Sequence, residues 1–218
     1  MSKKNLIITE DGSHTLFVPE VGESYHSRHG AIQESRHIFI DSGLRMIDKK
    51  DIRIFEMGFG SGLNALLSFD YARNYDKNII YDTIELYPLS IEEASEFNYP
   101  QILNIALDDF MILHKSEWET RHQLSPGFNL FKSKRDLLRF KPDAEYDLIF
   151  FDAFSPNVQP DLWKTPIFKD LYDSMPTGGI LTSYSVRGDF RRALKDAGFQ
   201  VEKIPGPPGK RHITRARK

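Results

Sequence analysis

The sequence predicts an α/β domain built on an open, mostly parallel sheet. Short apolar strand patterns alternate with helical patterns through most of the 218 residues, as in doubly wound folds. One strand-to-helix turn is rich in glycine, with Gly-Phe-Gly-Ser-Gly at residues 58–62. Acidic residues lie at the ends of three strand patterns, at Glu56, Glu85 and Asp152. Ligands bind at the carboxyl ends of the strands in such sheets, so we expect these elements to converge on one edge.

The first fifty residues predict a small extension in front of the main domain. Residues 5–9 and 15–19 are β-prone and flank Asp11-Gly12, which is a hairpin turn signal. Residues 27–46 have apolar positions at helical spacing and predict one or two helices. We therefore divide the chain into an extension at residues 1–50 and a main domain at residues 51–218.

The main domain repeats strand and helix in order. Its strand patterns are short and apolar, and they cover residues 52–57, 79–86, 128–131, 146–152 and 179–184. Its helical patterns cover residues 63–75, 88–97, 102–122, 135–140, 165–174 and 190–197. Residues 199–204 and 211–215 flank a Gly-Pro-Pro-Gly turn, so we expect a closing antiparallel pair there.

Composition excludes several classes of protein and site. Hydrophobic residues make up 40% of the chain and charged residues 28%, which excludes a disordered tail or a fibrous repeat. Cysteine is absent, which excludes disulfides, thiolate zinc sites, iron–sulfur clusters and a cysteine nucleophile. The pair His26-x-x-His29 lacks a third ligand, so we expect no metal. Without a signal-peptide core or an apolar stretch of ~20 residues, we expect a cytoplasmic protein.

The charge of the chain is distributed unevenly. Its 29 Lys and Arg and 31 Asp and Glu give a net charge of −2. Residues 187–218 carry a local charge of +7, so the remaining 186 residues carry −9. Basic residues that contact phosphates give affinity for nucleic acid. We expect any RNA contact at this basic end, with a solvated charged tail as the alternative.

The glycine loop, residues 58–62, indicates an adenosine-type ligand. Glycines permit a tight turn and close approach of a ligand to the backbone. A dinucleotide site needs Gly-x-Gly-x-x-Gly, but here the third glycine comes one place early and Leu63 stands in its position. Glu56 would repel a pyrophosphate but can pair with the ammonium of a methionine moiety, and Glu85 can accept both ribose hydroxyls. Together these residues favour S-adenosylmethionine over NAD.

The segment that follows the strand pattern at 146–152 predicts the reactive side of the site. Asp152 leaves an apolar strand, and Phe154, Ser155, Pro156 and Trp163 follow within eleven residues. Such a loop can stack a planar base and orient an amine towards an activated methyl group, and orientation can supply ~7–11 kcal/mol. Asp152 can hold the amine and accept its proton. A helix-capping role for Asp152, and ordinary core packing for Phe154 and Trp163, are the alternatives.

Several motifs occur together in one order along the chain. They are Tyr25-His26-Ser27, Gly30-Ala31 and Glu34-Ser35, Phe-Glu-Met-Gly-Phe-Gly-Ser-Gly-Leu-Asn at residues 55–64, Phe-Asp-Ala-Phe-Ser-Pro at 151–156, Leu162-Trp163, Tyr184-Ser185, Arg191-Arg192 and Gly-Pro-Pro-Gly-Lys-Arg at 206–211. In this combination the chain resembles the methyltransferase component of the MnmC family, the tRNA 5-methylaminomethyl-(2-thio)uridine biosynthesis enzymes. The resemblance covers nearly the whole chain, from about residue 24 to residue 215.

The resemblance implies a Rossmann-like class I S-adenosylmethionine-dependent methyltransferase fold with an antiparallel C-terminal strand. It implies methylation of the amine of 5-aminomethyl-(2-thio)uridine at the tRNA wobble position, with tRNA as the partner and no membrane. Bifunctional members of the family add a flavin-dependent oxidase half. Because this sequence stops at Lys218, we expect no oxidase half and no FAD.

The candidate residues fall into three groups. We assign Asp152 and Phe154 as catalytic. The cofactor group comprises Glu56, Gly58, Gly60, Gly62, Asn64, Glu85, Ser133 and Asp152. The substrate and tRNA group comprises Tyr25, Ser155, Pro156, Trp163, Tyr184, Arg187, Lys210 and Arg211.

One position departs from the family pattern. Members carry Gly-Asp-Ala after the third core strand, where the acid binds the adenine amino group. Here residues 131–136 read Phe-Lys-Ser-Lys-Arg-Asp, so Ser133 stands in the place of that acid. Asp136, from the next turn, is a candidate substitute.

Two other functions stay open from the sequence. The first is an aminopropyltransferase resembling spermidine synthase, which uses a similar nucleoside but needs further acids to hold a polyamine. The second is an inactive RNA-binding protein that keeps the fold without the chemistry, which the substitution at Ser133 allows.

Overall fold

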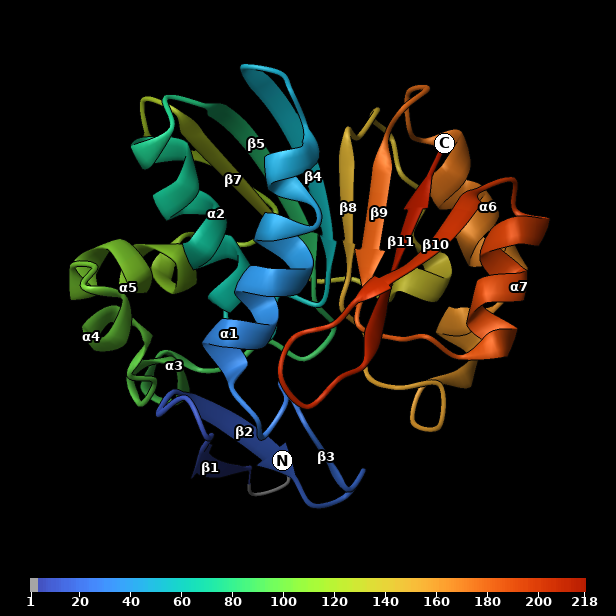
Figure 1. The fold of residues 1–218 in the computed structure, drawn as a ribbon. Helices are drawn as coiled ribbons and strands as arrows, with labels where there is room; N and C mark the ends of the chain where they lie inside the picture. The colour runs from blue at the N-terminus through green and yellow to red at the C-terminus, as the bar shows by residue number, and fades with distance from the viewer. Residues whose placement is uncertain (1–3) are drawn as a thin grey trace.

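Two β-sheets organise the chain in the computed structural model, which describes residues 4–218 (Figure 1). The smaller sheet has the order β1-β2-β3 and the larger has the order β10-β11-β9-β8-β4-β5-β7-β6. The strands of the smaller sheet are β1 (Asn5–Ile8), β2 (His14–Val18) and β3 (Glu23–Ser24). The strands of the larger sheet are β4 (Asp51–Met57), β5 (Asn78–Ile84), β6 (Arg121–Ser125), β7 (Phe128–Ser133), β8 (Leu148–Phe151), β9 (Ile180–Ser183), β10 (Gln200–Pro205) and β11 (His212–Arg217).

The centre of the larger sheet is parallel, as predicted. Strands β7, β5, β4, β8 and β9 pair in parallel, while β11 pairs antiparallel with both β9 and β10. This confirms the mostly parallel sheet and the closing antiparallel pair. The strand order reverses between β4 and β8, because the chain first builds outward from β4 to β7 and then returns to the other side. That switch point is where open α/β sheets bind ligands.

Helices cover both faces of this sheet. The helices are α1 (Ala31–Ser35), α2 (Leu63–Asn74), α3 (Ile91–Ser95), α4 (Tyr99–Leu103), α5 (Leu107–Lys115), α6 (Thr165–Asp173) and α7 (Gly188–Asp196). Helices α1, α2 and α5 lie on one side, and α6 and α7 on the other (Figure 1). Along residues 4–218 no helix has both the length and the apolar character needed to cross a membrane.

The apolar strands divide their side chains between two cores. Leu148 and Phe150 of β8 join the core under α1, α2 and α5, whereas Ile149 and Phe151 join the core under α6 and α7. Successive side chains of a strand point to opposite faces, so a strand covered on both faces must be apolar throughout. This explains the continuous apolar run that ends at Asp152.

One predicted helix is wrong. Residues 102–122 form parts of α4 and α5 and the start of β6 rather than one long helix. The helices break at Asn104, which ends α4 in the left-handed region with φ 54°, and Glu119 adopts φ 60° before β6. Asn tolerates that conformation and therefore ends helices. The edge strand β6 pairs antiparallel with β7, and four of its five residues are polar, so it lacks an apolar strand pattern.

The predicted N-terminal hairpin is confirmed by β1 and β2, and the predicted helical region is α1 followed by a π-helix at Arg36–Asp41 and a 3-10 helix at Leu44–Met46. Residues 1–3 of the proposed extension lie outside the described residues.

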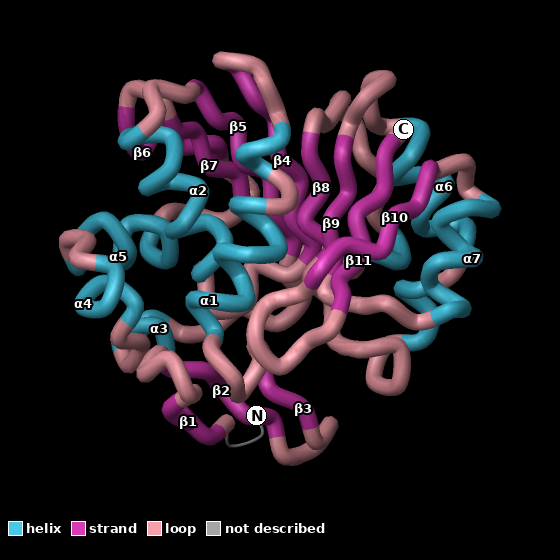
Figure 2. The backbone as a smooth tube through the Cα atoms, in the orientation of Figure 1, coloured by secondary structure: helices cyan, strands magenta, loops and turns pink. Residues whose placement is uncertain are grey.

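The small sheet lies beyond the carboxyl ends of the central strands (Figure 2). It is held there at its turn, where Asp11 accepts a hydrogen bond from the backbone N–H of Gln33 at 2.9 Å. Strand β2 is held by Asn98, whose side chain accepts from the N–H of His14 at 2.9 Å.

Candidate functional site

A cavity of about 1070 Å³ lies between the carboxyl edge of the large sheet and the small sheet. Its walls come from residues 17–28, from the loops after β4, β5, β7 and β8, and from Tyr184 and Lys210. Small-molecule sites are usually ~300–1,000 Å³. The cavity therefore has room for a nucleoside-sized ligand together with a second planar group.

The glycine loop turns sharply from β4 into α2 and forms one wall. Its N–H groups at Gly58 and Phe59 donate to the carbonyl of Ile84 at 3.0 and 3.3 Å, which ties the loop to the end of β5. Gly58 has φ +91°, and a Cβ there would lie 3.1 Å from the carbonyl oxygen of Asp152. Gly62 has φ +73°, and a Cβ there would lie 2.7 Å from Nε2 of His114. Both positions thus require glycine, on conformational and on steric grounds.

Glu85 follows β5 and reaches back to the glycine loop. Its Oε2 accepts from the N–H of Gly60 at 3.1 Å, and its Oε1 accepts from the N–H of Tyr87 at 2.8 Å. The side chain also lines the cavity. A carboxylate oxygen has lone pairs for more than one donor, so Glu85 can still accept hydroxyl groups from the cavity side.

Glu56 lies beneath the glycine loop and not in the cavity wall, which differs from its assigned role. It is fully buried, and its Oε2 accepts from the hydroxyl of Thr83, its partner across β4 and β5, at 2.8 Å. Burial raises the pKa of Glu56 to about 8. A carboxyl with that pKa is mostly protonated at neutral pH, so Glu56 offers no full negative charge to an ammonium group.

Asp152 stands at the carboxyl end of β8, next to the glycine loop. Its Oδ2 accepts a hydrogen bond from the side-chain amide of Asn64 in α2 at 2.9 Å. Both side chains line the cavity. Burial raises the pKa of Asp152 to about 7, and Asn64 opposes the rise by stabilising the charged form. This is the range in which one group can both accept and release a proton at neutral pH.

The β8 loop, residues 152–159, forms the opposite wall and is braced from behind. Trp163 has only 6% of its surface exposed, and its indole N–H donates to the carbonyl of Phe154 at 2.9 Å. The hydroxyl of Tyr184 donates to the carbonyl of Ala153 at 2.9 Å. Trp163 packs among Phe151, Phe190 and Tyr184 and does not line the cavity. Its role is to support the loop, which is the packing alternative considered from the sequence.

Lys210 brings a positive charge from the Gly-Pro-Pro-Gly turn to the cavity. Its ammonium lies 3.4 Å from Oε1 of Glu34 and 5.2 Å from the ring centre of Tyr184. The charge of Lys210 lowers the pKa of Asp152, while that of Glu34 raises it. Glu34 and Lys210 are therefore part of the electrostatic surroundings of Asp152, although they come from segments 176 positions apart.

The position of Ser133 bears on the departure from the family pattern. Its hydroxyl donates to the carboxylate of Glu119 at 3.1 and 3.2 Å, and the side chain does not line the cavity. Asp136, in contrast, lines the cavity, and its Oδ1 accepts from the N–H of Leu138 at 3.0 Å. Asp136, and not Ser133, therefore brings a side chain from the segment after β7 into the cavity, and that side chain is acidic.

The assigned residues divide into two sets. Those that line the cavity are Tyr25, Gly58, Gly60, Asn64, Glu85, Asp152, Phe154, Ser155, Tyr184 and Lys210. Those that do not line it are Glu56, Gly62, Ser133, Pro156, Trp163, Arg187 and Arg211. Sequence reasoning overlooked Glu23, which accepts hydrogen bonds from Ser155, and it gave Glu34 no role. Glu23 follows Gly22 in the turn from β2 to β3, and Glu34 lies in α1, so neither acid stands at the end of a strand of the large sheet, where the site residues were expected.

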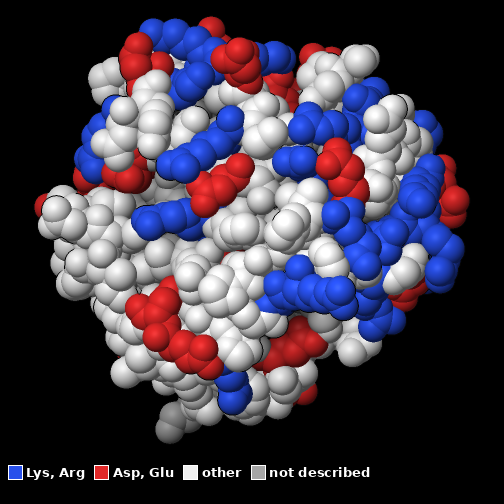
Figure 3. All heavy atoms as spheres, in the orientation of Figure 1, with Lys and Arg blue, Asp and Glu red and all other residues white. Residues whose placement is uncertain are grey.

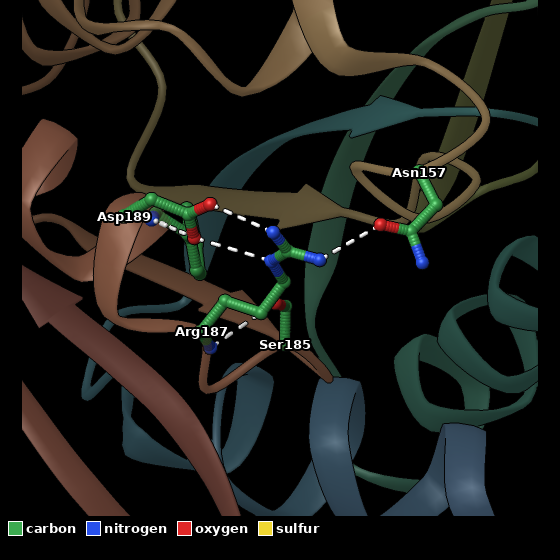
Figure 4. Close-up of polar contacts among 5 residues, drawn as sticks. Asn157, Ser185, Arg187 and Asp189 are labelled. Carbon is green, nitrogen blue, oxygen red and sulfur yellow. Dashed lines mark hydrogen bonds and ion pairs between the residues drawn. The ribbon is translucent and has the colours of Figure 1, made fainter.

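Arg187 lies outside the cavity and already has protein partners. Its guanidinium donates to both carboxylate oxygens of Asp189 at 3.2 and 2.9 Å and to Oδ1 of Asn157 at 2.9 Å (Figure 4). These bonds connect the start of α7 to the β8 loop. Further Lys and Arg side chains gather on the side of the molecule that carries Arg187, around α7 and the C-terminal strands (Figure 3). Part of that charge is compensated, since Glu202 pairs with Arg215 and Arg217.

The two histidines considered for a metal have separate partners. Nε2 of His26 lies 2.8 Å from the hydroxyl of Ser61 in the glycine loop. Nδ1 of His29 lies 3.0 Å from a carboxylate oxygen of Glu10. Among residues 4–218, no group of three His, Asp or Glu side chains is arranged to hold a metal ion.

Comparison with known proteins identifies relatives of the chain. Residues 131–218 match a family described as S-adenosyl-L-methionine-dependent methyltransferase. The tRNA 5-methylaminomethyl-2-thiouridine biosynthesis bifunctional protein MnmC of Aromatoleum aromaticum is 32% identical over 97% of this chain and 35% of its own length. The protein of the same name from Azoarcus sp. is 31% identical over 98% of this chain and 35% of its own length. The chain thus spans about a third of the length of these curated relatives.

Solved structures share the fold. MNMC2 from Aquifex aeolicus has a TM-score of 0.80 and 27% sequence identity, and covers 100% of this chain and 71% of its own. Spermidine synthase from Thermotoga maritima has a TM-score of 0.55 and 12% identity over 98% of this chain and 70% of its own, which shows a common fold alone. These similarities confirm the predicted Rossmann-like class I methyltransferase fold.

Proposed function

Because the chain is a member of the MnmC family of S-adenosyl-L-methionine-dependent methyltransferases, we propose that it methylates the amine of 5-aminomethyl-(2-thio)uridine at the wobble position of tRNA. The observation that carries this proposal is the position of Asp152. It stands at the switch point of the sheet, beside the glycine loop and inside the cavity, with one oxygen held by Asn64. A carboxylate in that place can orient an amine towards a methyl donor bound at the glycine loop.

The residues around the glycine loop fit S-adenosylmethionine. The loop passes close to Asp152 without side chains at Gly58 and Gly60, which leaves room for a ligand against the backbone. In this proposal Glu85 accepts the ribose hydroxyls, and Asp136 replaces Ser133 as the acceptor for the adenine amino group. When bound, S-adenosylmethionine supplies a methyl group that is already activated by its sulfonium.

The β8 loop and its neighbours would bind the target nucleoside. Phe154 and Tyr25 approach each other edge to face, with ring centres 5.5 Å apart, and both line the cavity. Together with Tyr184 they provide flat apolar surfaces against which a uracil ring can lie. These side chains would hold the aminomethyl group between Asp152 and the glycine loop.

Asp152 would then manage the proton of the amine. The amine attacks through its lone pair, so it must be unprotonated at that moment. As the new N–C bond forms, the electrons of the methyl–sulfur bond return to sulfur and the nitrogen becomes positively charged. Asp152 can accept the proton that the nitrogen must lose, before or after this step, directly or through water. With a pKa of about 7 it can also release that proton to solvent at neutral pH.

The decisive experiment is mass analysis of nucleosides. The full chain is incubated with methyl-labelled S-adenosylmethionine and tRNA that carries 5-aminomethyl-(2-thio)uridine, and the tRNA is then digested. We expect one labelled methyl group on the aminomethyl nitrogen. The same tRNA lacking the aminomethyl group is the matched control and should stay unlabelled. Label on another nucleoside would contradict the proposed substrate.

Two further measurements separate the alternative functions. Formation of a polyamine from decarboxylated S-adenosylmethionine and putrescine would establish an aminopropyltransferase. The geometry disfavours that reaction, because the cavity-lining acids Glu23 and Glu34 already have partners. Glu23 binds Ser155, and Glu34 binds Ser27 and Lys210. Calorimetry with S-adenosylhomocysteine tests an inactive RNA-binding protein, since an intact site binds this product and a dead site does not.

A further inference from the structure

Residues 23–26, which comprise β3 and the two residues after it, touch both walls of the cavity. The carboxylate of Glu23 accepts from the backbone N–H of Ser155 at 3.1 Å and also from its hydroxyl. The ring of Tyr25 packs against Phe154, and His26 lies 2.8 Å from the hydroxyl of Ser61 in the glycine loop. One short segment therefore contacts the β8 loop at its start and the glycine loop at its end.

We propose that Glu23 is a positioning residue, which acts through Ser155 to hold Phe154 and the β8 loop in the shape that receives the target nucleoside. The proposal rests on the proposed methyl transfer for its effect on activity. Its structural part, the restraint of the loop, does not depend on which reaction the cavity performs.

The β8 loop is held from two opposite directions. On the side of the large sheet, Tyr184 binds the carbonyl of Ala153 and Trp163 binds the carbonyl of Phe154. On the side of the small sheet, Glu23 binds the N–H of the next residue, Ser155. Three successive residues thus have a backbone group fixed by a side chain. Removing the bond to Glu23 leaves the backbone of Phe154 restrained from behind, with only the ring contact of Tyr25 on the side of the small sheet.

The chemistry of this contact favours a carboxylate over an amide. Ser155 presents two donors, its N–H and its hydroxyl, and an ionised carboxylate offers two acceptors and no donor. A glutamine at position 23 would keep one acceptor and place an NH₂ group opposite the second donor. Hydrogen bonds to a charged acceptor are also stronger than those to a neutral one.

The small sheet does not depend on Glu23 for its own placement. Asp11 accepts from the N–H of Gln33 at the N-terminus of α1, and His14 is bound to Asn98 and to the carbonyl of Glu96. Lys4 adds an ion pair with Glu93. The contacts of Asp11 and His14 lie at the other end of the sheet, whereas Lys4 is at the end that carries Glu23. A change at Glu23 should therefore affect the β8 loop without releasing the sheet.

The test measures loop opening and catalysis in the full chain with Glu23→Gln. We expect amide hydrogen exchange in residues 153–159 to become roughly tenfold faster, as for a lost charged hydrogen bond. We expect kcat on tRNA to fall by about tenfold, while the affinity for S-adenosylhomocysteine changes less than about twofold. Glu10→Gln, which removes a carboxylate from the exposed turn of the same sheet, is the matched control and should change neither quantity.

Other outcomes would overturn the proposal. Unchanged exchange in residues 153–159 would show that Glu23 restrains nothing, and faster exchange across residues 5–18 as well would show that the sheet has merely detached. Ser155→Ala removes only the hydroxyl and serves if Glu23→Gln does not fold; it should accelerate exchange in the same peptide. Combined with Glu23→Gln, it should add little, because the two residues act through one contact. If the wild type methylates nothing, the proposed function fails while the exchange experiment still decides on Glu23.

Discussion

The two walls of the cavity are built in different ways. The glycine-loop wall is local, since Gly60 and Glu85, 25 positions apart, belong to successive strand ends. The β8-loop wall is assembled from distant segments, since Glu23 and Ser155 are 132 positions apart, and Lys210 pairs with Glu34 across the length of the chain. We infer that a site for a common cofactor can be built from residues close together in the sequence. A site for a particular methyl acceptor needs residues from distant segments of the chain.

Two buried acids near these walls also differ in charge. Burial raises the pKa of Glu56, beneath the glycine loop, to about 8, and that of Asp152, the first residue of the β8 loop, to about 7. At neutral pH the first carboxyl is mainly neutral, and the second is divided between its two forms. The first is suited to a structural role and the second to proton transfer.

The largest effect should come from Asp152→Asn. This change keeps an acceptor for Asn64 but removes the base, so kcat should fall by roughly 10²–10³. The affinity for S-adenosylhomocysteine, measured by calorimetry, should change less than about twofold. An equal loss of both quantities would mean that the two walls are not functionally distinct at Asp152.

The pH dependence of kcat/KM tests the assignment of Asp152 as the proton acceptor. Asp152 must be ionised to accept a proton, so kcat/KM should fall as the pH drops below about 7. The charge of Lys210 favours the ionised form, so Lys210→Met should shift this limb to higher pH. The measurement is single-turnover methylation from about pH 5.5 to 9. If the fall of kcat/KM occurs at the same pH in Lys210→Met and in the wild type, the charge of Lys210 does not affect the pKa of Asp152.

Glu85→Ala tests the glycine-loop wall, with a smaller effect. It removes a charged acceptor from the loop and from the proposed ribose site, so the Kd for S-adenosylhomocysteine should rise about 10- to 100-fold. Turnover at saturating cofactor should fall much less. Glu92→Ala, on the exposed side of α3, is the control and should bind normally. A loss confined to kcat would contradict the separation of the walls.

Glu56→Gln should change stability rather than binding. Between about pH 4.5 and 8 the folded protein holds a proton on Glu56 that the unfolded chain has lost, so the wild type loses stability as the pH rises. The loss attributable to Glu56 approaches about 1.4 kcal/mol per pH unit. Urea unfolding near pH 6 and pH 7 should show that Glu56→Gln removes this part of the slope. Parallel curves for the two proteins would contradict a neutral Glu56.

The smallest effect should come from Arg211→Gln at the basic end. Loss of one phosphate contact should weaken tRNA binding a few-fold and reduce the slope of log K against log salt by about 0.7–0.9. Arg187→Gln should reduce that slope less, because Arg187 already pairs with Asp189 and Asn157. Anisotropy titrations from about 50 to 200 mM salt measure both variants. If the slope of log K against log salt is the same for both variants and the wild type, tRNA does not contact Arg211 or Arg187.

The difference between the walls explains what the sequence could predict. The alternating patterns, Gly58 to Gly62, Glu85 and Asp152 are local signals, and the structure places the strand ends on one edge as expected. Glu23 lies in the two-residue strand β3, which pairs with β2, but its contact with Ser155 joins residues 132 positions apart and has no local sequence signal. Sequence also could not separate Trp163, which supports the loop, from Phe154, which faces the cavity, because both are aromatic residues near Asp152.

The position of β11 has a consequence for synthesis on the ribosome. Residues 212–217 insert between β9 and β10, so β10 has no strand to pair with until they emerge. Until then the edge of β9 is open, and Lys210, just before β11, cannot reach Glu34. Domains fold progressively from their N-terminus during translation, and open strand edges favour aggregation. Until β11 emerges, the nascent protein therefore holds a complete glycine loop beside an incomplete β8-loop wall, which still lacks the pair of Lys210 and Glu34.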